Sequence, residues 1–297
     1  MSTVCIASHD AGGAEVLACY VTQNGLRCRF ALEGPALKVF ERHLGRVAVE
    51  PLSAAIVRSD WCLFGTSWQS DLEWRAIDEA KRAGRRVVSF LDHWVNYPER
   101  FERGGVRHLP DEIWVGDEEA QALALGHFPD LAVKLVPNPY FAYVEREIAR
   151  YSFPHTGERA LFVSENLSAH ARLRFGDERY WGYTELDAIE YFLLRLRDLG
   201  IERAVLRPHP SDPEGKYDHI VASHPRVAEV SNGKPLLEEI AQADLVAGCE
   251  SVALVAALRA KKRVMCAIPP GGRVQHIDQR RGVEMLRDLP AKWRASA

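Results

Sequence analysis

Several signatures of common binding sites are missing from this 297-residue sequence. It has no C-x-x-C pair and no H-E-x-x-H motif, which argues against the familiar structural and catalytic zinc sites. No two aspartates stand two positions apart, so the D-x-D pattern with which many sugar transferases hold a divalent ion is also missing. The G-x-G-x-x-G fingerprint of dinucleotide-binding folds is absent too. We therefore expect neither a metal nor a cofactor.

The charge and hydropathy patterns exclude further classes of protein. Lys and Arg together number 38 against 41 Asp and Glu, and a net charge of -3 argues against general nucleic-acid binding. No apolar run approaches the roughly 20 residues of a membrane helix, and the start "MSTVCIASHDAGG" lacks the basic region of a signal peptide. We expect a cytoplasmic protein with at most peripheral membrane contact. Its six cysteines are expected to be free thiols.

Short β-rich runs alternate with helical patterns along the whole chain. The strands expected in the first half are 3–8, 27–32, 60–67, 85–92, 112–117 and 132–138, and those in the second half are 159–165, 203–210, 226–231, 243–249 and 262–268. Such alternation predicts parallel sheets covered by helices on both faces. The fold class is therefore α/β with two Rossmann-like domains, at 1–142 and 159–297, joined by a linker at 143–158. The polar stretch that ends at Gly182 is expected to be a long loop.

Ligands of open parallel sheets bind beyond the carboxyl ends of the strands, so the residues that follow each strand are the candidates. "SHDAGGAE" follows the first strand, and it brings three ionisable groups and two glycines to one turn. The glycines allow close approach of a ligand to the backbone. The structural alternative is a turn in which Asp10 caps the first helix. The candidates here are His9, Asp10, Gly12, Gly13 and Glu15.

Two further strand ends in the first half carry polar groups. Thr66 and Ser67 follow one strand, where their hydroxyls could instead cap the next helix. The loop "DHWVNYPERF" follows another strand and begins with Asp92 and His93. Aromatic rings beside hydrogen-bonding side chains suit a sugar face or a base. The alternative is a packed loop around a buried tryptophan.

The second half has three such strand ends: "SENLS", "RPHPSD" and "GCESVALVAAL". The last begins a helix whose free N–H groups favour an anion. The imidazole and guanidinium of "RPHP" supply further donors, and its prolines hold the backbone out of a helix. This combination predicts a phosphate site without a metal. Its candidates are Ser164, Glu165, Arg207, His209, Glu250 and Ser251. The loop at 269–273 is expected to be a plain connection.

The "RPHP" strand end, followed about forty residues later by the "GCES" turn, resembles the GT-B class of glycosyltransferases. The resemblance is strongest to bacterial surface-glycan enzymes: metal-independent sialyltransferases and polysialyltransferases with an "HP" motif, and capsule or teichoic-acid transferases. "LFVSEN", "YTELDAIEYFLLRL" and "RPHPSDPEGKY" are also similar to uncharacterised polysaccharide-biosynthesis proteins. The resemblance implies that the two domains face each other across a cleft, with the acceptor side in the first and the nucleotide-sugar site in the second.

The same resemblance implies roles for single residues. His209 would contact the phosphate of the leaving nucleotide, and Ser251 would bind that phosphate at the helix start. An acidic residue of the first half would be the general base. Asp10 is our choice, with Glu15 and Asp92 as rivals, because the acidic tripeptide of the polysialyl enzymes is missing.

The implied reaction is glycosyl transfer from a nucleotide donor to a hydroxyl of a glycan, lipid-linked or protein acceptor. A CMP-activated nonulosonic or sialic-type acid is favoured as the donor, while UDP-sugars and CDP-polyols stay open. The alternatives are a nucleotide-sugar 2-epimerase or hydrolase of the same architecture, and a non-catalytic nucleotide-binding relative.

Overall fold

The computed structural model describes residues 2–67, 70–154, 156–274 and 282–290. The chain divides into two compact units, Met1–Tyr143 and Val144–Ala297, which we call the N-unit and the C-unit. Within the described residues each unit contains one six-stranded sheet, and all strand pairs in both sheets are parallel. The predicted α/β class with two Rossmann-like sheets is confirmed.

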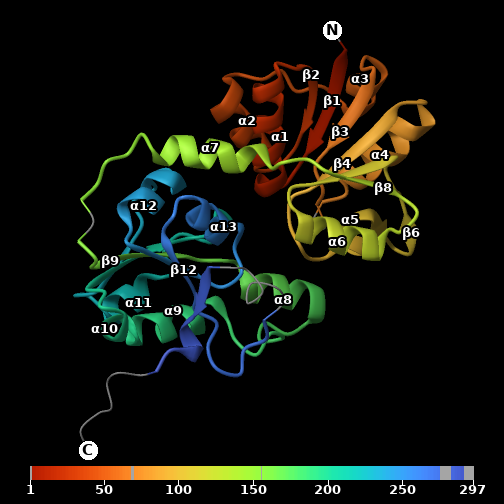
Figure 1. Ribbon diagram of the computed structural model, residues 1–297. Helices are drawn as coiled ribbons and strands as arrows, with labels where there is room; N and C mark the ends of the chain where they lie inside the picture. Colours follow the sequence, from red (N-terminus) through yellow and green to blue (C-terminus); the bar gives the residue numbers. More distant parts are fainter. Residues whose placement is uncertain (1, 68–69, 155, 275–281, 291–297) are drawn as a thin grey trace, which may run out of the picture. The chain divides into compact units, whose positions relative to one another are not determined.

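The N-unit sheet has the order β2-β1-β3-β4-β7-β8. Its strands are β1 (Thr3–Ser8), β2 (Arg27–Leu32), β3 (Trp61–Phe64), β4 (Arg86–Leu91), β7 (Glu112–Val115) and β8 (Ala132–Leu135). Helices α1 (Ala11–Asn24) and α2 (Ala36–Leu44) cover one face, whereas α3 (Leu52–Val57) and α4 (Leu72–Arg82) cover the other (Figure 1). The N-unit also contains α5 (Tyr97–Phe101), α6 (Glu118–His127) and the small hairpin of β5 (Glu102–Arg103) and β6 (Val106–Arg107).

The C-unit sheet has the order β11-β10-β9-β12-β13-β14. Its strands are β9 (Arg159–Val163), β10 (Arg203–Arg207), β11 (Ala228–Val230), β12 (Leu245–Gly248), β13 (Arg263–Cys266) and β14 (Val283–Met285). Helices α12 (Leu236–Gln242) and α13 (Val252–Arg259) cover one face (Figure 1). The opposite face carries α9 (Glu185–Leu194), α10 (Leu196–Leu199) and α11 (Asp218–Ser223), and a single turn of 3-10 helix, Leu286–Asp288, follows β14.

The central strands are buried on both faces, which explains why they appear in the sequence as continuous apolar runs. All four residues of β7 and of β12 are buried. Helix ends follow local chemistry: α1 stops at Gly25, which has a left-handed φ of 57°, and α9 starts with a capping box of Thr184 and Asp187. Five of the six cysteines are buried and all are free thiols, as expected.

Two segments differ from the sequence-based expectation. The stretch before Gly182 is not all loop, because α8 (Leu167–Phe175) forms there. The segment 143–158 begins inside α7 (Pro139–Ile148), so its first part is helical. Across the described part of the chain, every helix is too short or too polar to cross a bilayer.

In each sheet there is one strand with successive strands of the chain added on its opposite sides, so that the strand order reverses there. In the N-unit the chain adds β2 on one side of β1 and then β3 on the other, and in the C-unit β12 is added beside β9 on the side opposite to β10. Crevices form at such points because the loops that leave the two adjacent strands diverge. The loops after β1 and β3, and those after β9 and β12, are therefore the natural places for a ligand.

Candidate functional site

The loop after β1 presents a carboxylate that does not cap its helix. Asp10 occupies the N-cap position of α1, yet its side chain makes no capping hydrogen bond. Its Oδ1 lies 2.8 Å from Nδ1 of His9, and both side chains are 26% exposed. The His9 ring in turn lies against Gly34, which follows β2. The structural alternative of a simple cap is therefore not what this structure shows, and the Asp10 carboxylate is open to a ligand.

The loop after β4 places a second carboxylate beside the start of α1. Asp92 Oδ2 would lie 2.5 Å from a Cβ built on Gly12, so a larger residue at that position would displace the Asp92 carboxylate. Arg100 donates to Asp92 Oδ1 at 3.2 Å and to the carbonyl and hydroxyl oxygens of Thr66 at 2.8 and 2.9 Å. Burial raises the pKa of Asp92, Arg100 opposes that shift, and the charge of Asp10 adds to it.

A third acidic side chain, Glu73, reaches the same strand end from the first turn of α4. Its Oε1 accepts a hydrogen bond of 2.7 Å from the backbone N–H of His9. Burial, together with the charge of Asp10, raises the pKa of Glu73 to about 8. We call Asp10, Glu73 and Asp92 the N-unit acid cluster. Carboxyl groups with a raised pKa, such as those of Glu73 and Asp92, concentrate at functional sites.

The other candidates of the N-unit have structural partners. Glu15 pairs with Arg42 and lies 2.7 Å from His43, so it joins α1 to α2. The Ser67 hydroxyl accepts the N–H of Ser70 at 3.0 Å. Gly13 packs against the turn after β3, where a Cβ would make ordinary contacts.

The predicted loop around a buried tryptophan is also present. His93 Nδ1 accepts the N–H of Trp94 at 3.0 Å, and Trp94 is 7% exposed. The indole N–H of Trp94 donates to the Asp117 carboxylate at 3.0 and 3.1 Å. This loop therefore packs beside the acid cluster, with Trp94 as its core.

His209 is the central donor of the C-unit. Its Nδ1 accepts the N–H of Ser211 at 3.2 Å and lies 2.7 Å from the hydroxyl of the same residue. An N–H donor requires a lone pair on Nδ1, so the proton of the neutral ring lies on Nε2. Burial lowers the pKa of His209, with Asp212 opposing that shift, so the ring is neutral at neutral pH. The remaining ring nitrogen, Nε2, is thus a hydrogen-bond donor.

A buried polar network fixes the backbone under His209. The side chain of Asp212 accepts the N–H of His209 at 2.8 Å, the hydroxyl of Tyr217 at 2.6 Å and the ammonium of Lys216 at 2.6 Å. Lys216 also pairs with Glu185. Burial would lower the pKa of Lys216, but its bonds to these two carboxylates raise it. The strand end at "RPHPSD" is therefore a rigid support for one imidazole.

The N-terminus of α13, expected to bind a phosphate, holds a carboxylate of the same chain. Glu165 Oε1 accepts the N–H of Glu250 at 2.7 Å. Burial raises the pKa of Glu165 to about 7, while hydrogen bonds from the backbone of Glu250, Cys249 and Ser251 oppose that shift. The Ser251 hydroxyl accepts the N–H of Ala253 at 3.2 Å and so caps the helix. A ligand phosphate has to displace Glu165 to reach these N–H groups.

One expected contact is corrected by the structure. Arg207 does not extend toward Ser251, because it pairs with Glu239 of α12 and donates to the carbonyl of Lys234 at 2.7 Å. Glu239 is 6% exposed and needs a cation, which explains the capture of this guanidinium. Ser164 is also inward-facing, since its hydroxyl lies 2.7 Å from that of Tyr217.

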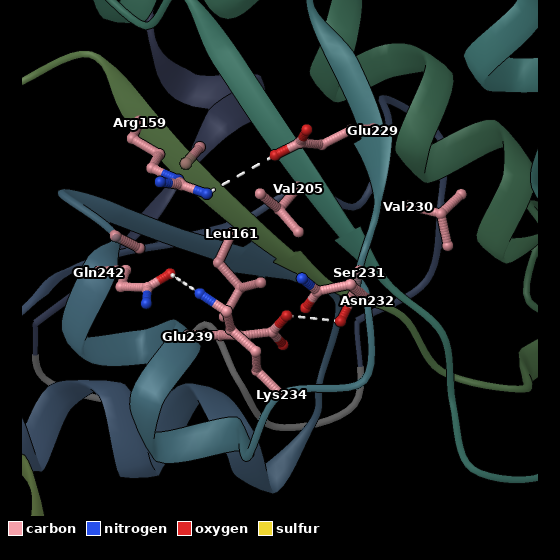
Figure 2. A pocket seen from close by; sticks show the side chains of 12 residues that line it. Arg159, Leu161, Val205, Glu229, Val230, Ser231, Asn232, Lys234, Glu239 and Gln242 are labelled. Carbon is pink, nitrogen blue, oxygen red and sulfur yellow. Dashed lines mark hydrogen bonds and ion pairs between the residues drawn. The ribbon is translucent and has the colours of Figure 1, made fainter.

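A cavity of about 90 Å³ lies under α12, between that helix and strands β9, β10 and β11 (Figure 2). Its charged groups bond to other residues of the lining. Arg159 lies 3.6 Å from Glu229, Lys234 donates to Gln242 at 3.3 Å, and Glu239 accepts from Ser231. The cavity is lined partly by residues within the strands, such as Leu161 and Val205, and we assign it no ligand.

No three His, Cys, Asp or Glu side chains among the described residues are grouped so that they could hold a metal ion. The donors at the strand ends are an imidazole, hydroxyls and backbone N–H groups, and these suit a phosphate directly.

Several residues of these sites were not predicted from the sequence. Glu73 lies in a helix rather than after a strand, and Glu185 and Lys216 lie within "YTELDAIEYFLLRL" and "RPHPSDPEGKY" but were assigned no role. A signal for Glu73 does exist: it shares the spacing of the buried positions Ala76, Ile77 and Ala80 of α4. A glutamate in the apolar stripe of a helix is a buried acid.

No protein-family model matches the chain, and no curated protein is significantly similar to it in sequence. Solved structures are similar in fold. The UDP-GlcNAc 2-epimerase from Neisseria meningitidis, bound to UDP-GlcNAc, matches with a TM-score of 0.63 at 10% identity, over 95% of this chain and 86% of its own.

The UDP-GlcNAc 2-epimerase from Methanocaldococcus jannaschii matches with a TM-score of 0.62 at 10% identity, over 96% of this chain and 88% of its own. A glycosyltransferase of kitacinnamycin matches with a TM-score of 0.53 at 12% identity, over 96% of this chain and 86% of its own. These identities establish the fold alone. The chain has the GT-B-like fold of two Rossmann-like domains that glycosyltransferases and nucleotide-sugar 2-epimerases share.

Proposed function

We propose that the protein is an enzyme of nucleotide-activated sugars that transfers a sugar to a hydroxyl acceptor without a metal ion. The observation that carries the proposal is the placement of His209, whose Nδ1 and backbone are held so that Nε2–H remains as a donor. The fold supports it, because similar structures include a glycosyltransferase and an epimerase with UDP-GlcNAc bound.

In the proposed reaction the C-unit binds the phosphate of the donor. Glycosyl transfer passes through an oxocarbenium-like state in which negative charge grows on the leaving phosphate. His209 Nε2–H meets that charge, and the N–H groups at the start of α13 join once Glu165 has left them. Ser251 holds the helix start in place with its cap and can donate its hydroxyl proton to the same phosphate.

The N-unit supplies the general base. Asp10 is our choice because its carboxylate is partly exposed and caps nothing, whereas Glu15 is tied to α2 and Asp92 to Arg100. The carboxylate accepts the proton of the acceptor hydroxyl as that oxygen bonds to the sugar carbon and the nucleotide departs. His9 orients it through the 2.8 Å contact.

The proposed identity of the donor and of the acceptor rests on the resemblance of the "HP" motif. It favours a CMP-activated nonulosonic or sialic-type acid as the donor, and a surface glycan, lipid-linked or protein hydroxyl as the acceptor. A cytoplasmic location fits a nucleotide-sugar donor. UDP-sugars are the strongest competitor for the donor, since two of the similar structures act on UDP-GlcNAc by name.

The second candidate is a nucleotide-sugar 2-epimerase. The fold comparison favours it, because the two epimerases match with TM-scores of 0.63 and 0.62, against 0.53 for the kitacinnamycin glycosyltransferase. An epimerase also needs perturbed carboxyl groups, and the N-unit acid cluster would serve it. It differs in needing no acceptor.

A two-step experiment tests the proposal. Thermal shift with CMP, CDP, UDP, GDP and dTDP identifies the carrier through stabilisation of the native state. The matching sugar nucleotides are then incubated with and without acceptors, in EDTA, and the products are resolved. Transfer predicts acceptor-dependent release of free nucleotide that EDTA does not stop. An epimeric sugar nucleotide without acceptor favours the second candidate, and binding without turnover indicates a non-catalytic relative.

A further inference from the structure

Glu73 is an acidic side chain in a place that packing alone does not explain. It lies in the first turn of α4, is 1% exposed, and shares the helix face of the buried Ala76 and Ile77. Its Oε1 accepts the N–H of His9, 64 residues away in the chain. Its Oε2 is buried and has no hydrogen-bond partner among the described residues. Burial of an unpartnered carboxyl oxygen is unfavourable, so it points to a function.

No cation among the described residues compensates the charge of this carboxyl. The charged groups around it are His9 and Asp10 at the end of β1, and Asp92 with Arg100 after β4. Arg100 is taken up by Asp92 and Thr66. Asp10 and Asp92 both raise the pKa of Glu73, after burial itself, and the result is about 8. A proton on Oε2 is the arrangement that this surrounding favours at neutral pH.

The contact with His9 places Glu73 directly behind the candidate base. The backbone N–H of His9 donates to Glu73, and the ring Nδ1 of His9 contacts Asp10. A neutral carboxyl keeps this chain of contacts while adding no charge. An ionised one would put a further negative charge beside Asp10 and Asp92, which repels both from their observed positions.

We propose that Glu73 is a positioning residue of the N-unit acid cluster: its protonated carboxyl anchors His9 and so holds Asp10 in place as the base. This inference rests on the proposed function for the role of Asp10. The protonation itself does not, and it can be measured without any substrate. Glu73 is not part of the proton transfer, since it contacts His9 and not the acceptor.

The pH dependence of the free energy of unfolding shows whether folded Glu73 carries that proton. Folded Glu73 keeps its proton to about pH 8, whereas an unfolded glutamate loses it near its ordinary pKa of 4.5. Between these values the folded protein binds one proton more, so Glu73 destabilises it progressively as the pH rises. Glu73→Gln is nearly isosteric, its amide oxygen can accept from His9, and it does not titrate. The difference in Tm between Glu73→Gln and wild type should increase in favour of the variant by about 2–4 °C per pH unit across this range.

The control is Glu79→Gln, in the same helix and not in the acid cluster. It should follow the wild-type pH dependence of Tm. Parallel wild-type and Glu73→Gln curves would overturn the proposal, because the carboxyl would then be ionised in the folded protein.

The positioning role needs a second readout, the NMR signals of the His9 ring. In wild type these should show a transition near pH 8, when Glu73 ionises and Asp10 moves, and Glu73→Gln should lose it. Turnover should fall through the same pH range in wild type and not in Glu73→Gln. An unchanged His9 transition or an unchanged pH profile in the variant would overturn the positioning role. Absence of turnover with every donor in wild type would overturn the proposed function alone.

Discussion

The two sheets present their strand ends with opposite electrostatic designs. In the C-unit three buried carboxylates at the strand ends have donors: Asp212 and Glu185 share Lys216, and Glu165 accepts from the start of α13. In the N-unit, the charge of Asp10 adds to the effect of burial in raising the pKa of Glu73 and of Asp92, and Arg100 pairs with Asp92. The C-unit strand ends form a hydrogen-bonded scaffold, whereas the N-unit strand end contains a buried carboxyl oxygen, Glu73 Oε2, without a hydrogen-bond partner among the described residues.

This difference indicates a division of labour. Carboxylates whose hydrogen bonds are satisfied rigidify a loop, and in the C-unit Asp212 holds the backbone of His209, whose neutral ring can donate to an anion. In the N-unit, burial keeps a proton on Glu73 near neutral pH, and the partly exposed carboxylate of Asp10 is the proposed acceptor of the proton that general base catalysis moves. The C-unit is therefore suited to hold a phosphate and the N-unit to move a proton.

The largest expected effect comes from removing the base. Asp10→Asn should lower turnover by about 10²–10⁴-fold, because the amide cannot take the acceptor proton. Donor consumption at saturating donor measures it. Glu15→Gln is the matched control and should retain turnover, since Glu15 is bonded to Arg42 and His43. Equal losses in both variants would make Glu15 a rival base again.

The second effect is on the donor of the C-unit. His209→Ala should reduce turnover about a hundredfold or more, since loss of one well-placed donor raises a barrier by about 2.7–4 kcal/mol. Steady-state kinetics with the carrier found by thermal shift measures it. His219→Ala, at an exposed position of α11, serves as the control. Wild-type turnover in His209→Ala would remove the imidazole from the mechanism.

The third effect is on stability. Lys216→Met leaves the carboxylates of Asp212 and Glu185, which are 0% and 1% exposed, without their ammonium. Breaking a buried pair on one side lowers the free energy of unfolding by about 3–5 kcal/mol. Denaturant unfolding measures it, with Lys38→Met on α2 as the control. A change under about 1 kcal/mol would show that the network is not what fixes this loop.

The smallest effect concerns the carboxylate at the start of α13. Glu165 loses its proton near pH 7, so above that pH its charge competes with a ligand phosphate for the same N–H groups. Wild type should bind a sugar nucleotide a few-fold more tightly at about pH 6 than at about pH 8, and Glu165→Gln should not depend on pH in this way. Calorimetry measures both. A pH-dependent Glu165→Gln would place the competing group elsewhere.

Much of the fold follows from the sequence because buried parallel strands are short, apolar and bounded by turns. The bounds of β1 and β2 coincide with the predicted strands at 3–8 and 27–32. Helix α8 was missed for a physical reason: among its residues only Ala171 is buried, so it lacks an apolar stripe. Its sequence has the polarity of a loop.

The sequence predicted the parts of the candidate site that strand order places together. It did not predict which side chains pair with each other. The ends of neighbouring parallel strands share an edge, and this rule alone brings Glu165, after β9, near Glu250, after β12. Asp10 and Asp92 lie at one edge of the N-unit sheet, but β3 separates the strands that they follow. The rule cannot say that Arg207 is captured by Glu239, 32 residues later, or that Glu73 reaches His9 from a helix. Those contacts depend on which buried charge would be most unfavourable without a partner, and the sequence does not show this.

Calorimetric titration of the cognate nucleotide into wild type, Asp10→Asn and His209→Ala tests the division of labour most directly. We predict that His209→Ala weakens binding about tenfold or more, through loss of a hydrogen bond to a charged group, while Asp10→Asn binds as wild type does. The account is contradicted if Asp10→Asn loses the affinity and His209→Ala keeps it, since the phosphate would then lie with the N-unit.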